Sequence, residues 1–377
     1  MIYLDHAATT PIDPSVRTVM DEVNYSCFAN PSSIHSSGQK SKLLLEKSRE
    51  IVAQSIGGKP GEIVFTSGGT EANNLAIIGA AKGNRKKGNH IITSKIEHPA
   101  VLETFKYLSK NGFRVSYLNV DNNGSLDLAQ LKKTICNETI LISLMMVNNE
   151  TGCLLPIMEA GQLIKDQSII FHSDAVQALD KIDIRLDEIN IDLLSLSSHK
   201  IYGPKGCGTL YVRQGTIIEP IFFGGSQETL RRPGTENLVA IAGFAEALNQ
   251  MQLNHSNRKL IQSRGILFEK KLKEIIPNLE INGENITRVP GYSNVYFPFM
   301  AGDSIVMNLD LHAIAVSTGS ACSSGSQKPS HVLQAMGFDS KRINNSVRFS
   351  LGRYTTEEEI LKTIDVLKTI YKNAVKK

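Results

Sequence analysis

Short apolar runs alternate with amphipathic stretches along the chain from about Ile63 to Val212. Such runs, rich in β-branched side chains, are typical of buried strands. The stretches between them, for example 99–108 and 126–134, have the apolar spacing of helices. This alternation favours an α/β fold, in which a mostly parallel sheet carries helices on both faces. The predicted strands are 62–66, 90–94, 114–118, 139–144, 169–173 and 192–196.

The pattern changes after Gly234. Helices are expected at 238–253, 259–276 and 356–371, and strands at 292–297 and 346–351. Thr356 is the expected N-cap of the last helix, because glutamates fill its first turn. This second set of elements predicts a smaller α+β domain. We therefore expect a large domain at 16–254 and a small domain made of 1–15 and 255–377.

Composition excludes several classes of protein. The chain has 377 residues, 41% hydrophobic and 21% charged, which is typical of a globular enzyme with a large core. Its net charge is +4 and no long basic stripe is present, so direct nucleic-acid binding is not expected. The N-terminus does not have the pattern of a signal peptide, and no run is long enough to predict a membrane span.

The cysteines point to a reducing compartment. They are five in number and far apart, and none forms a Cys-x-x-Cys pair, so neither a disulfide framework nor a structural metal site is expected. We therefore predict a cytoplasmic protein without a metal centre. In that setting a single thiol can act as a nucleophile, although most buried cysteines are small apolar residues. The five are Cys27, Cys136, Cys153, Cys207 and Cys322.

Lys200 stands where an apolar run meets a turn. It follows the run 191–196 directly after His199, and glycine and proline come just beyond it. A lysine held at the end of a buried strand can have a lowered pKa, which a Schiff-base amine needs. The alternative is a structural lysine whose stem is covered and whose ammonium reaches solvent.

A glycine turn at 66–73 joins a predicted strand to a predicted helix. Two glycines there allow a ligand to approach the backbone, and the helix N-terminus directs free N–H groups towards it. The hydroxyl of Thr70 lies beside Gly69 in this turn. Together these groups suit a phosphate, although a simple strand-to-helix turn has the same pattern.

Three further polar residues follow predicted strands. His98 can stack on a flat ring or act as an acid or base, or it can merely cap a helix. Asn149, in the run 148–152, can hold a ring substituent, or that run can be ordinary turn chemistry. Asp174 can pair with a protonated ring nitrogen, or it can be an N-cap. With a Schiff-base lysine and a phosphate turn, these residues at successive strand ends indicate pyridoxal 5'-phosphate.

A set of motifs spans essentially the whole chain. They are Tyr3-Leu-Asp-His-Ala-Ala-Thr-Thr-Pro, Asn30-Pro-Ser-Ser-Ile-His, Phe65-Thr-Ser-Gly-Gly-Thr-Glu-Ala-Asn-Asn, Val147-Asn-Asn-Glu-Thr-Gly, Asp174-Ala-Val-Gln, His199-Lys200, Arg232-Pro-Gly-Thr-Glu-Asn, Gly319-Ser-Ala-Cys-Ser-Ser-Gly and Val347-Arg-Phe-Ser-Leu-Gly-Arg. With these motifs the chain resembles the class V aminotransferase-like enzymes, and among them the cysteine desulfurases of the NifS and IscS type. The resemblance implies the fold type I of pyridoxal-phosphate enzymes.

The resemblance also implies residue roles. Lys200 would form the Schiff base with the cofactor, and Asp174 would pair with its pyridine nitrogen. Thr235 would reach the phosphate of the other subunit, which implies a homodimer with composite sites. The remaining roles are a stacking and catalytic His98, a ring-oxygen ligand in Gln177, a ring neighbour in Asn149, phosphate ligands in Gly69, Thr70, Ser197 and His199, and substrate contacts in Arg348 and Asn30.

Cys322 decides the type of reaction. Its surroundings, at about 317–329, are small, polar and rich in glycine, which predicts an exposed mobile loop. The resemblance implies that Cys322 takes sulfur from L-cysteine as a persulfide and leaves alanine. It also implies a sulfur acceptor, either an iron–sulfur scaffold or a tRNA-thiolation enzyme. The alternatives are a selenocysteine lyase or a related pyridoxal-phosphate Cα-lyase, and a non-enzymatic sulfur-carrier scaffold.

Four positions depart from the family pattern without removing a catalytic group. They are Ala29, Met146, Ser198 and Pro233. The chain also ends soon after its last predicted helix, where IscS-type enzymes carry a C-terminal extension used near their scaffold partner. The runs Gly224-Gly-Ser-Gln-Glu and Gly234-Thr-Glu-Asn, together with the short end, favour a tRNA-thiolation or generalist role, and the acceptor stays open.

Overall fold

The structure is a computed structural model that describes residues 1–254, 256–319 and 329–376. Its helices are α1 Pro14–Ser26, α2 Ser36–Ser55, α3 Gly69–Gly83, α4 Pro99–Lys110, α5 Leu128–Thr134, α6 Ile157–Leu163, α7 Leu238–Leu253, α8 Asn257–Ile275, α9 Gly302–Asp310, α10 His331–Ala335, α11 Ser340–Asn344 and α12 Glu357–Val375. Its strands are β1 Ile2–Tyr3, β2 Ile63–Thr66, β3 His90–Ser94, β4 Arg114–Leu118, β5 Thr139–Ser143, β6 Ile170–Asp174, β7 Leu193–Ser197, β8 Gly208–Val212, β9 Glu280–Ile281, β10 Tyr292–Tyr296, β11 Ile314–Ala315 and β12 Ser346–Ser350.

A seven-stranded sheet forms the centre of the larger part of the molecule. Its strand order is β2-β8-β7-β6-β5-β3-β4. Strand β8 is antiparallel to both of its neighbours, β2 and β7, and the five strands from β7 to β4 in this order pair in parallel. The predicted α/β fold with a mostly parallel sheet is therefore confirmed. The carboxyl ends of β3, β5, β6 and β7 lie at the same edge, where a ligand site is expected.

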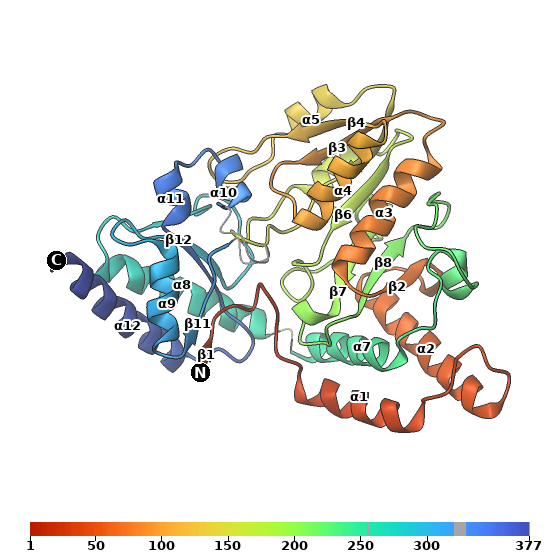
Figure 1. The fold of residues 1–377 in the computed structure, drawn as a ribbon, viewed down its shortest axis with the longest axis horizontal. Helices are drawn as coiled ribbons and strands as arrows, with labels where there is room; N and C mark the ends of the chain where they lie inside the picture. The colour runs from red at the N-terminus through yellow and green to blue at the C-terminus, as the bar shows by residue number, and fades with distance from the viewer. Residues whose placement is uncertain (255, 320–328, 377) are drawn as a thin grey trace.

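Neighbouring residues on each strand face opposite layers of helices. Val64, Ile91 and Leu141 pack with α3 and α4 in one apolar core. Phe65 and Ile92 lie in another core, together with residues of α1, α2 and α7. This alternation explains why the strands read as continuous apolar runs, since both faces of the sheet are covered. Figure 1 shows α3 and α4 in front of the sheet and α1 and α7 along its lower side.

The C-terminal part has its own apolar core beside this sheet (Figure 1). It contains the antiparallel sheet β12-β10-β9 and the parallel pair β1-β11. Ile2 and Leu4 lie in this core with Phe268 and Phe349, so the start of the chain packs against its end. This packing supports the predicted small domain of 1–15 and 255–377, whose boundaries remain a prediction.

The last helix begins as its sequence indicates. The Thr356 hydroxyl accepts a bond from the Glu359 N–H at 3.2 Å, and the Glu359 carboxylate accepts one from the Thr356 N–H at 2.9 Å. This capping box satisfies two N–H groups that the helix itself leaves free. No helix of the described residues is long and apolar enough to cross a membrane.

Candidate active site

A cavity of about 200 Å³ opens at the carboxyl ends of the parallel strands. It is lined by Ala7, Ala8, Gly69, Thr70, Asn73, His98, Met145, Val147, Asn149, Asp174, Val176, Gln177, Ser197, His199, Lys200 and Arg348. The structure thus brings together at one site nearly all the residues that the sequence analysis selected from distant segments.

Lys200 enters this cavity three residues beyond the end of β7. Every residue of β7 is buried, and Lys200 follows in a short 3-10 turn, Ser198–Lys200. Its Nζ donates to the carbonyls of Ala7 at 2.8 Å and Ala8 at 2.6 Å. These contacts tie the lysine to the N-terminal segment, and they hold its amine inside the cavity rather than in solvent.

Asp174 is a buried carboxylate without a cation. It is 5% exposed at the end of β6, and no ion pair joins it to any described residue. Its Oδ1 accepts from the Val176 N–H at 3.0 Å, and its Oδ2 accepts from the Asn73 amide at 2.7 Å. No helix begins at Asp174, so the bond to Val176 closes a turn and is not an N-cap. A buried carboxylate is costly without a positive partner, so this position suits a cationic group in the cavity.

His98 caps a helix and also lines the cavity. Its Nδ1 accepts the N–H of Ala100 at 3.1 Å as the N-cap of α4, and its ring lines the cavity. Burial lowers the pKa of His98, and Lys200 lowers it further, while Asp174 opposes both effects. The imidazole is therefore neutral at neutral pH, as a ring that stacks on a flat cofactor should be.

Gln177 is oriented by a residue from the C-terminal part. The Tyr292 hydroxyl donates to Gln177 Oε1 at 2.5 Å, and Gln177 Nε2 donates to the Ala7 carbonyl at 2.9 Å. Burial raises the pKa of Tyr292, so its hydroxyl remains a donor. With its oxygen engaged by Tyr292, the amide presents its NH₂ group to the side where Ala7 and Lys200 lie.

The N-terminus of α3 forms one end of the cavity. Gly68, which precedes it, has φ 151 and ψ −177, a conformation that only glycine adopts readily. A Cβ on Gly69 would lie 2.6 Å from the side chain of Val176, so the backbone passes close to the cavity wall. Ser197 Oγ is buried without a partner among the described residues. The His199 ring contacts Thr9 Oγ1 at 3.1 Å, and burial lowers the pKa of His199 to about 4.

Arg348 lies fully buried on β12 at the other side of the cavity. Its Nη2 pairs with Asp5 Oδ1 at 2.8 Å, and its Nη1 donates to the Asn149 carbonyl at 2.9 Å. Its Nε has no partner among the described residues, and neither has Asn149 Oδ1. The guanidinium is thus held in place, and its Nε–H remains available to donate to a ligand. Beside Asn149, Asn148 closes the turn with its own amide, so one asparagine serves the turn and the next faces the cavity.

Two predicted residues, Asn30 and Thr235, do not line this cavity, and a third, Cys322, is not among the described residues. Asn30 is exposed, and its side chain accepts the Ser32 N–H at 2.8 Å. Thr235 is exposed in the segment before α7. Cys322 belongs to residues 320–328, which lie outside the described part of the chain.

Sequence reasoning missed three residues that organise the site. Asn73 holds Asp174, Tyr292 orients Gln177, and Asp5 pairs with Arg348. A signal existed for Asn73, since an amide on the apolar face of a helix needs a partner. Tyr292 and Asp5 act across more than a hundred residues of sequence, and no local pattern predicts such contacts.

The model of the class V aminotransferases matches residues 2–362. The chain belongs to this family. A cysteine desulfurase IscS of Dictyoglomus turgidum is 46% identical over 371 residues, which cover 98% of this chain and 94% of that protein. A solved NifS-like protein superposes with a TM-score of 0.93 at 35% identity, covering 98% of this chain and 99% of the other. A structure described as SspA in complex with cysteine gives a TM-score of 0.83 at 36% identity, covering 94% and 100%.

This class V aminotransferase therefore has the family and the fold that its motifs predicted. Enzymes of the family use pyridoxal 5'-phosphate, and the site has places for its three polar regions. Asp174 would supply a negative charge for the ring nitrogen. Ser197 Oγ and the N-terminus of α3 would supply donors for the phosphate, and Lys200 lines the same cavity. The described residues contain no group of three or more His, Cys, Asp and Glu side chains arranged to hold a metal ion.

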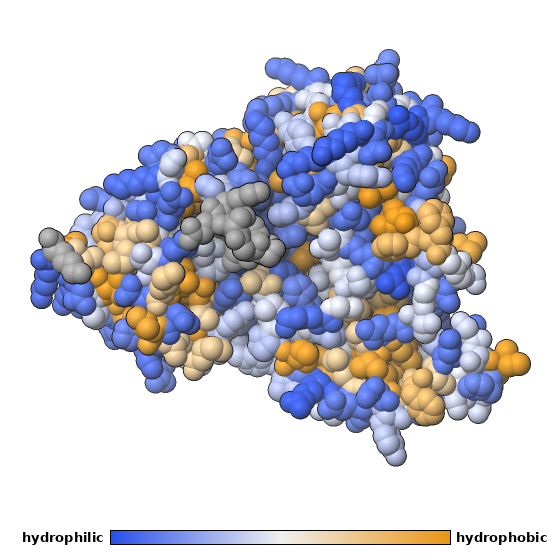
Figure 2. Space-filling model, viewed as in Figure 1, coloured by the Kyte–Doolittle hydropathy of each residue, from blue (hydrophilic) through white to orange (hydrophobic). Residues whose placement is uncertain are grey.

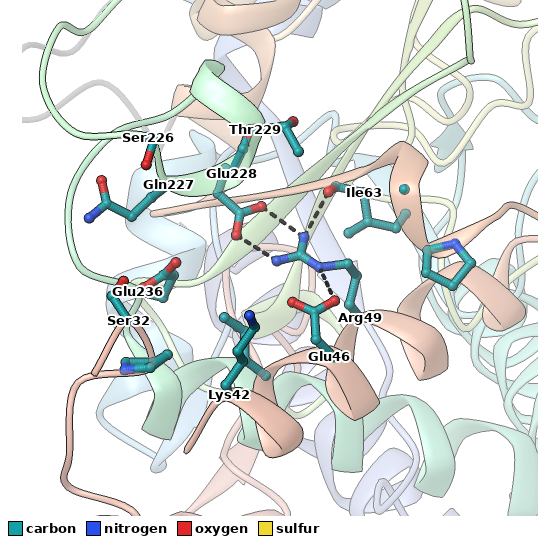
Figure 3. Close-up of a pocket in the computed structure, with 14 residues that line it drawn as sticks. Ser32, Lys42, Glu46, Arg49, Ile63, Ser226, Gln227, Glu228, Thr229 and Glu236 are labelled. Atoms are coloured by element: carbon teal, nitrogen blue, oxygen red, sulfur yellow. Dashed lines mark hydrogen bonds and ion pairs between the residues drawn. The ribbon is translucent and has the colours of Figure 1, made fainter. Parts of the chain in front are cut away.

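A second cavity, of about 420 Å³, is larger but lacks this chemistry (Figure 3). Its central group is Arg49, whose guanidinium is already paired with Glu228 through bonds of 2.8 and 2.7 Å. Figure 3 shows Glu228 pointing at Arg49 from the segment after β8. Lys42 and Glu236 also line this cavity, but none of its lining residues lies at the carboxyl ends of the parallel strands β3, β5, β6 and β7. Glu228 lies in the turn Gln227–Leu230, and the chain runs from this turn to Thr235.

Proposed function

We propose that this class V aminotransferase is a cysteine desulfurase that converts L-cysteine to L-alanine and transfers the sulfur to Cys322 as a persulfide. One observation carries the proposal: the Lys200 amine and the buried, uncompensated Asp174 carboxylate line one cavity in a chain 46% identical to a cysteine desulfurase. When bound, pyridoxal phosphate supplies an electron-withdrawing ring that stabilises negative charge at the substrate Cα.

Individual side chains bind the substrate and move its protons. Arg348 binds the substrate carboxylate through the donors that Asp5 and Asn149 leave available. Asp174 would pair with the ring nitrogen, and Lys200 moves the proton at the substrate Cα. The Cys322 thiolate attacks the substrate sulfur. The carbon–sulfur bond breaks, the carbon takes a proton to give alanine, and the sulfur remains on Cys322.

The test is a turnover assay with the purified holoenzyme. L-Cysteine should yield alanine and, with a thiol reductant, an equal amount of sulfide. Lys200→Ala should lose the visible absorbance of the bound cofactor and all turnover. Preference for selenocysteine with Cys322 dispensable would instead favour a selenocysteine lyase. Partner function that survives Lys200→Ala would favour a sulfur-carrier scaffold.

We further propose that the enzyme is a homodimer in which Thr235 reaches the phosphate of the partner's site. Exposed apolar side chains support an interface: Tyr25, Phe28, Ile34 and Phe223 are 82–94% exposed. Figure 2 shows apolar patches on the side of the molecule that carries α1, α2 and the segment before α7.

Subunit mixing tests this composite site. A mixed dimer of Lys200→Ala and Thr235→Ala chains has one site with both residues intact, if Thr235 acts across the interface. Mixing the two variants at limiting cofactor should therefore restore activity that neither variant has alone. No recovery in verified mixed dimers would place Thr235 in its own chain's site or in none.

The sulfur acceptor is proposed to be an iron–sulfur scaffold or a tRNA-thiolation enzyme, in the cytoplasm. A reducing compartment suits the proposed chemistry, because it keeps the nucleophilic thiol available, and the four described cysteines are free. Transfer of radiolabelled sulfur from cysteine to candidate acceptors would identify the acceptor. Cell fractionation would test the compartment.

A further inference from the structure

Glu150 lies next to the cavity-lining Asn149 but does not itself line the cavity. Its side chain is buried in the turn between β5 and α6. The Asn148 side chain fixes this turn, because its Oδ1 accepts the N–H groups of Glu150 at 2.9 Å and of Thr151 at 3.0 Å. The Asn294 amide also donates to the Glu150 carbonyl at 3.2 Å. The backbone at Glu150 is therefore held in a fixed position, from which the carboxylate extends.

That carboxylate touches the chain on both sides of residues 320–328. Its Oε2 accepts the hydroxyl of Ser330 at 2.5 Å. The same oxygen lies so close to Gly319 that it would overlap a Cβ at that position. Only glycine permits this approach without displacing the carboxylate. A single oxygen atom thus contacts Gly319, where the chain enters the segment that contains Cys322, and Ser330, just after it leaves.

Each contact is reinforced by a further bond. Ser330 is the N-cap of α10, since its hydroxyl also accepts the Leu333 N–H at 3.1 Å. Ser317 exchanges two backbone bonds with Arg348, at 2.7 and 3.3 Å. Arg348 in turn donates to the carbonyl of Asn149. The start of the segment, its end and the candidate carboxylate-binding arginine are therefore all joined to the turn that carries Glu150.

We propose that Glu150 is a positioning residue that holds both ends of the Cys322 segment at a fixed place beside the cofactor cavity. The inference rests on the proposed function, since only a thiol that must reach the substrate sulfur needs such placement. It predicts that loss of the carboxylate slows sulfur transfer and leaves the binding of cofactor and substrate unchanged. A misplacement of about 1 Å can reduce a reaction rate about a hundredfold, so a loss of about tenfold to a hundredfold in kcat is expected.

Three variants of the holoenzyme test this role, with Glu159→Ala on the exposed face of α6 as the matched control. Glu150→Ala removes the carboxylate. Gly319→Ala displaces it without removing a polar group, since only the flexible end of the Glu150 side chain has to move. Glu150→Gln keeps an oxygen acceptor for Ser330. The first two should lower kcat and keep KM and the cofactor spectrum, and Glu150→Gln should retain most of the activity.

Hydrogen–deuterium exchange gives a readout that does not depend on turnover. Glu150→Ala should speed exchange in peptides at both ends, 317–319 and 331–335, and Glu159→Ala should not. Unchanged exchange at either end, or an unchanged kcat in Glu150→Ala, would overturn the proposal. Equal loss of kcat in Glu150→Gln and Glu150→Ala would also overturn it, because the charge rather than the position would then matter. If the wild type produces no alanine, the proposed function fails, and exchange alone still decides whether Glu150 holds both ends.

Discussion

Replacing Glu228, which does not line the cofactor cavity, by glutamine should destabilise the enzyme. The Glu228 side chain is 1% exposed and the Arg49 side chain 11%, and two bonds of 2.8 and 2.7 Å join them. Glu228 Oε2 also accepts the N–H of Phe65 at 2.8 Å. A glutamine keeps one oxygen but turns an NH₂ group towards these donors, so a buried guanidinium loses its main partner.

The burial of the Arg49–Glu228 ion pair determines the expected loss of stability. Breaking one side of a buried ion pair typically costs about 3–5 kcal/mol. Glu46 remains 3.3 Å from Arg49 and compensates in part, so we expect a loss of about 3 kcal/mol. With a urea slope of about 3 kcal/mol per molar, the midpoint of unfolding should fall by about 1 M.

The same bond also shapes the segment that leads to Thr235. Glu228, Thr229 and Leu230 have φ values of 45, 54 and 65, all in the left-handed region. Non-glycine residues keep such values only where surrounding contacts enforce them. Loss of the Glu228 anchor should let the segment relax, so that Glu228→Gln releases cofactor faster than the wild type.

Urea unfolding followed by circular dichroism measures the stability, at a fixed cofactor concentration. Glu46→Gln is the matched control, because its half-exposed pair with the same arginine should contribute at most about 1 kcal/mol. If Glu228→Gln shifts the midpoint no more than Glu46→Gln does, the buried pair is not the anchor inferred here.

Three other changes test separate parts of the structure. Burial raises the pKa of Glu97 to about 8, so this residue stabilises the fold fully below its ordinary pKa of about 4.5 and loses that contribution as the pH rises through 8. Glu97→Gln should therefore flatten the pH dependence of the melting temperature between these values, and an unchanged slope would contradict the assignment. Leu230→Gly should raise the free energy of unfolding by up to about 1 kcal/mol. A left-handed residue that is not glycine costs about 1–2 kcal/mol, and the exposed leucine side chain has little packing to lose. A lower urea midpoint in the variant would show that the left-handed backbone at Leu230 does not cost stability. Tyr292→Phe should shift the absorbance of the bound cofactor without unfolding the enzyme, because Gln177 loses the donor that sets its amide; a spectrum identical to the wild type would show that Tyr292 does not orient Gln177.

The sheet and the main site residues were predictable because one physical rule links them. Strands covered on both faces read as apolar runs, and parallel strands bring their carboxyl ends to one edge. His98, Asp174 and Lys200 each follow such a run, so the sequence alone indicates that they meet. Helix ends were less exact: the helix expected from residue 259 begins at Asn257, because its first turn is polar.

The supporting contacts could not be read from the sequence. Asn148 and Asn149 have the same side chain in adjacent positions, yet one closes a turn and the other faces the cavity. Glu150 follows them as an ordinary polar turn residue, and only the packing of Gly319 and Ser330 around it shows its place. Such partners lie far away in the chain, and their side chains meet only in the folded state.

The central claim is that sulfur from L-cysteine passes to Cys322. Its most direct test is mass spectrometry of the holoenzyme after a single turnover with L-cysteine and no thiol reductant. The account predicts one equivalent of alanine and one added sulfur atom on the peptide that contains Cys322, with neither product in Cys322→Ala. Alanine formed at the wild-type rate by Cys322→Ala, or added sulfur on a different cysteine, would contradict it.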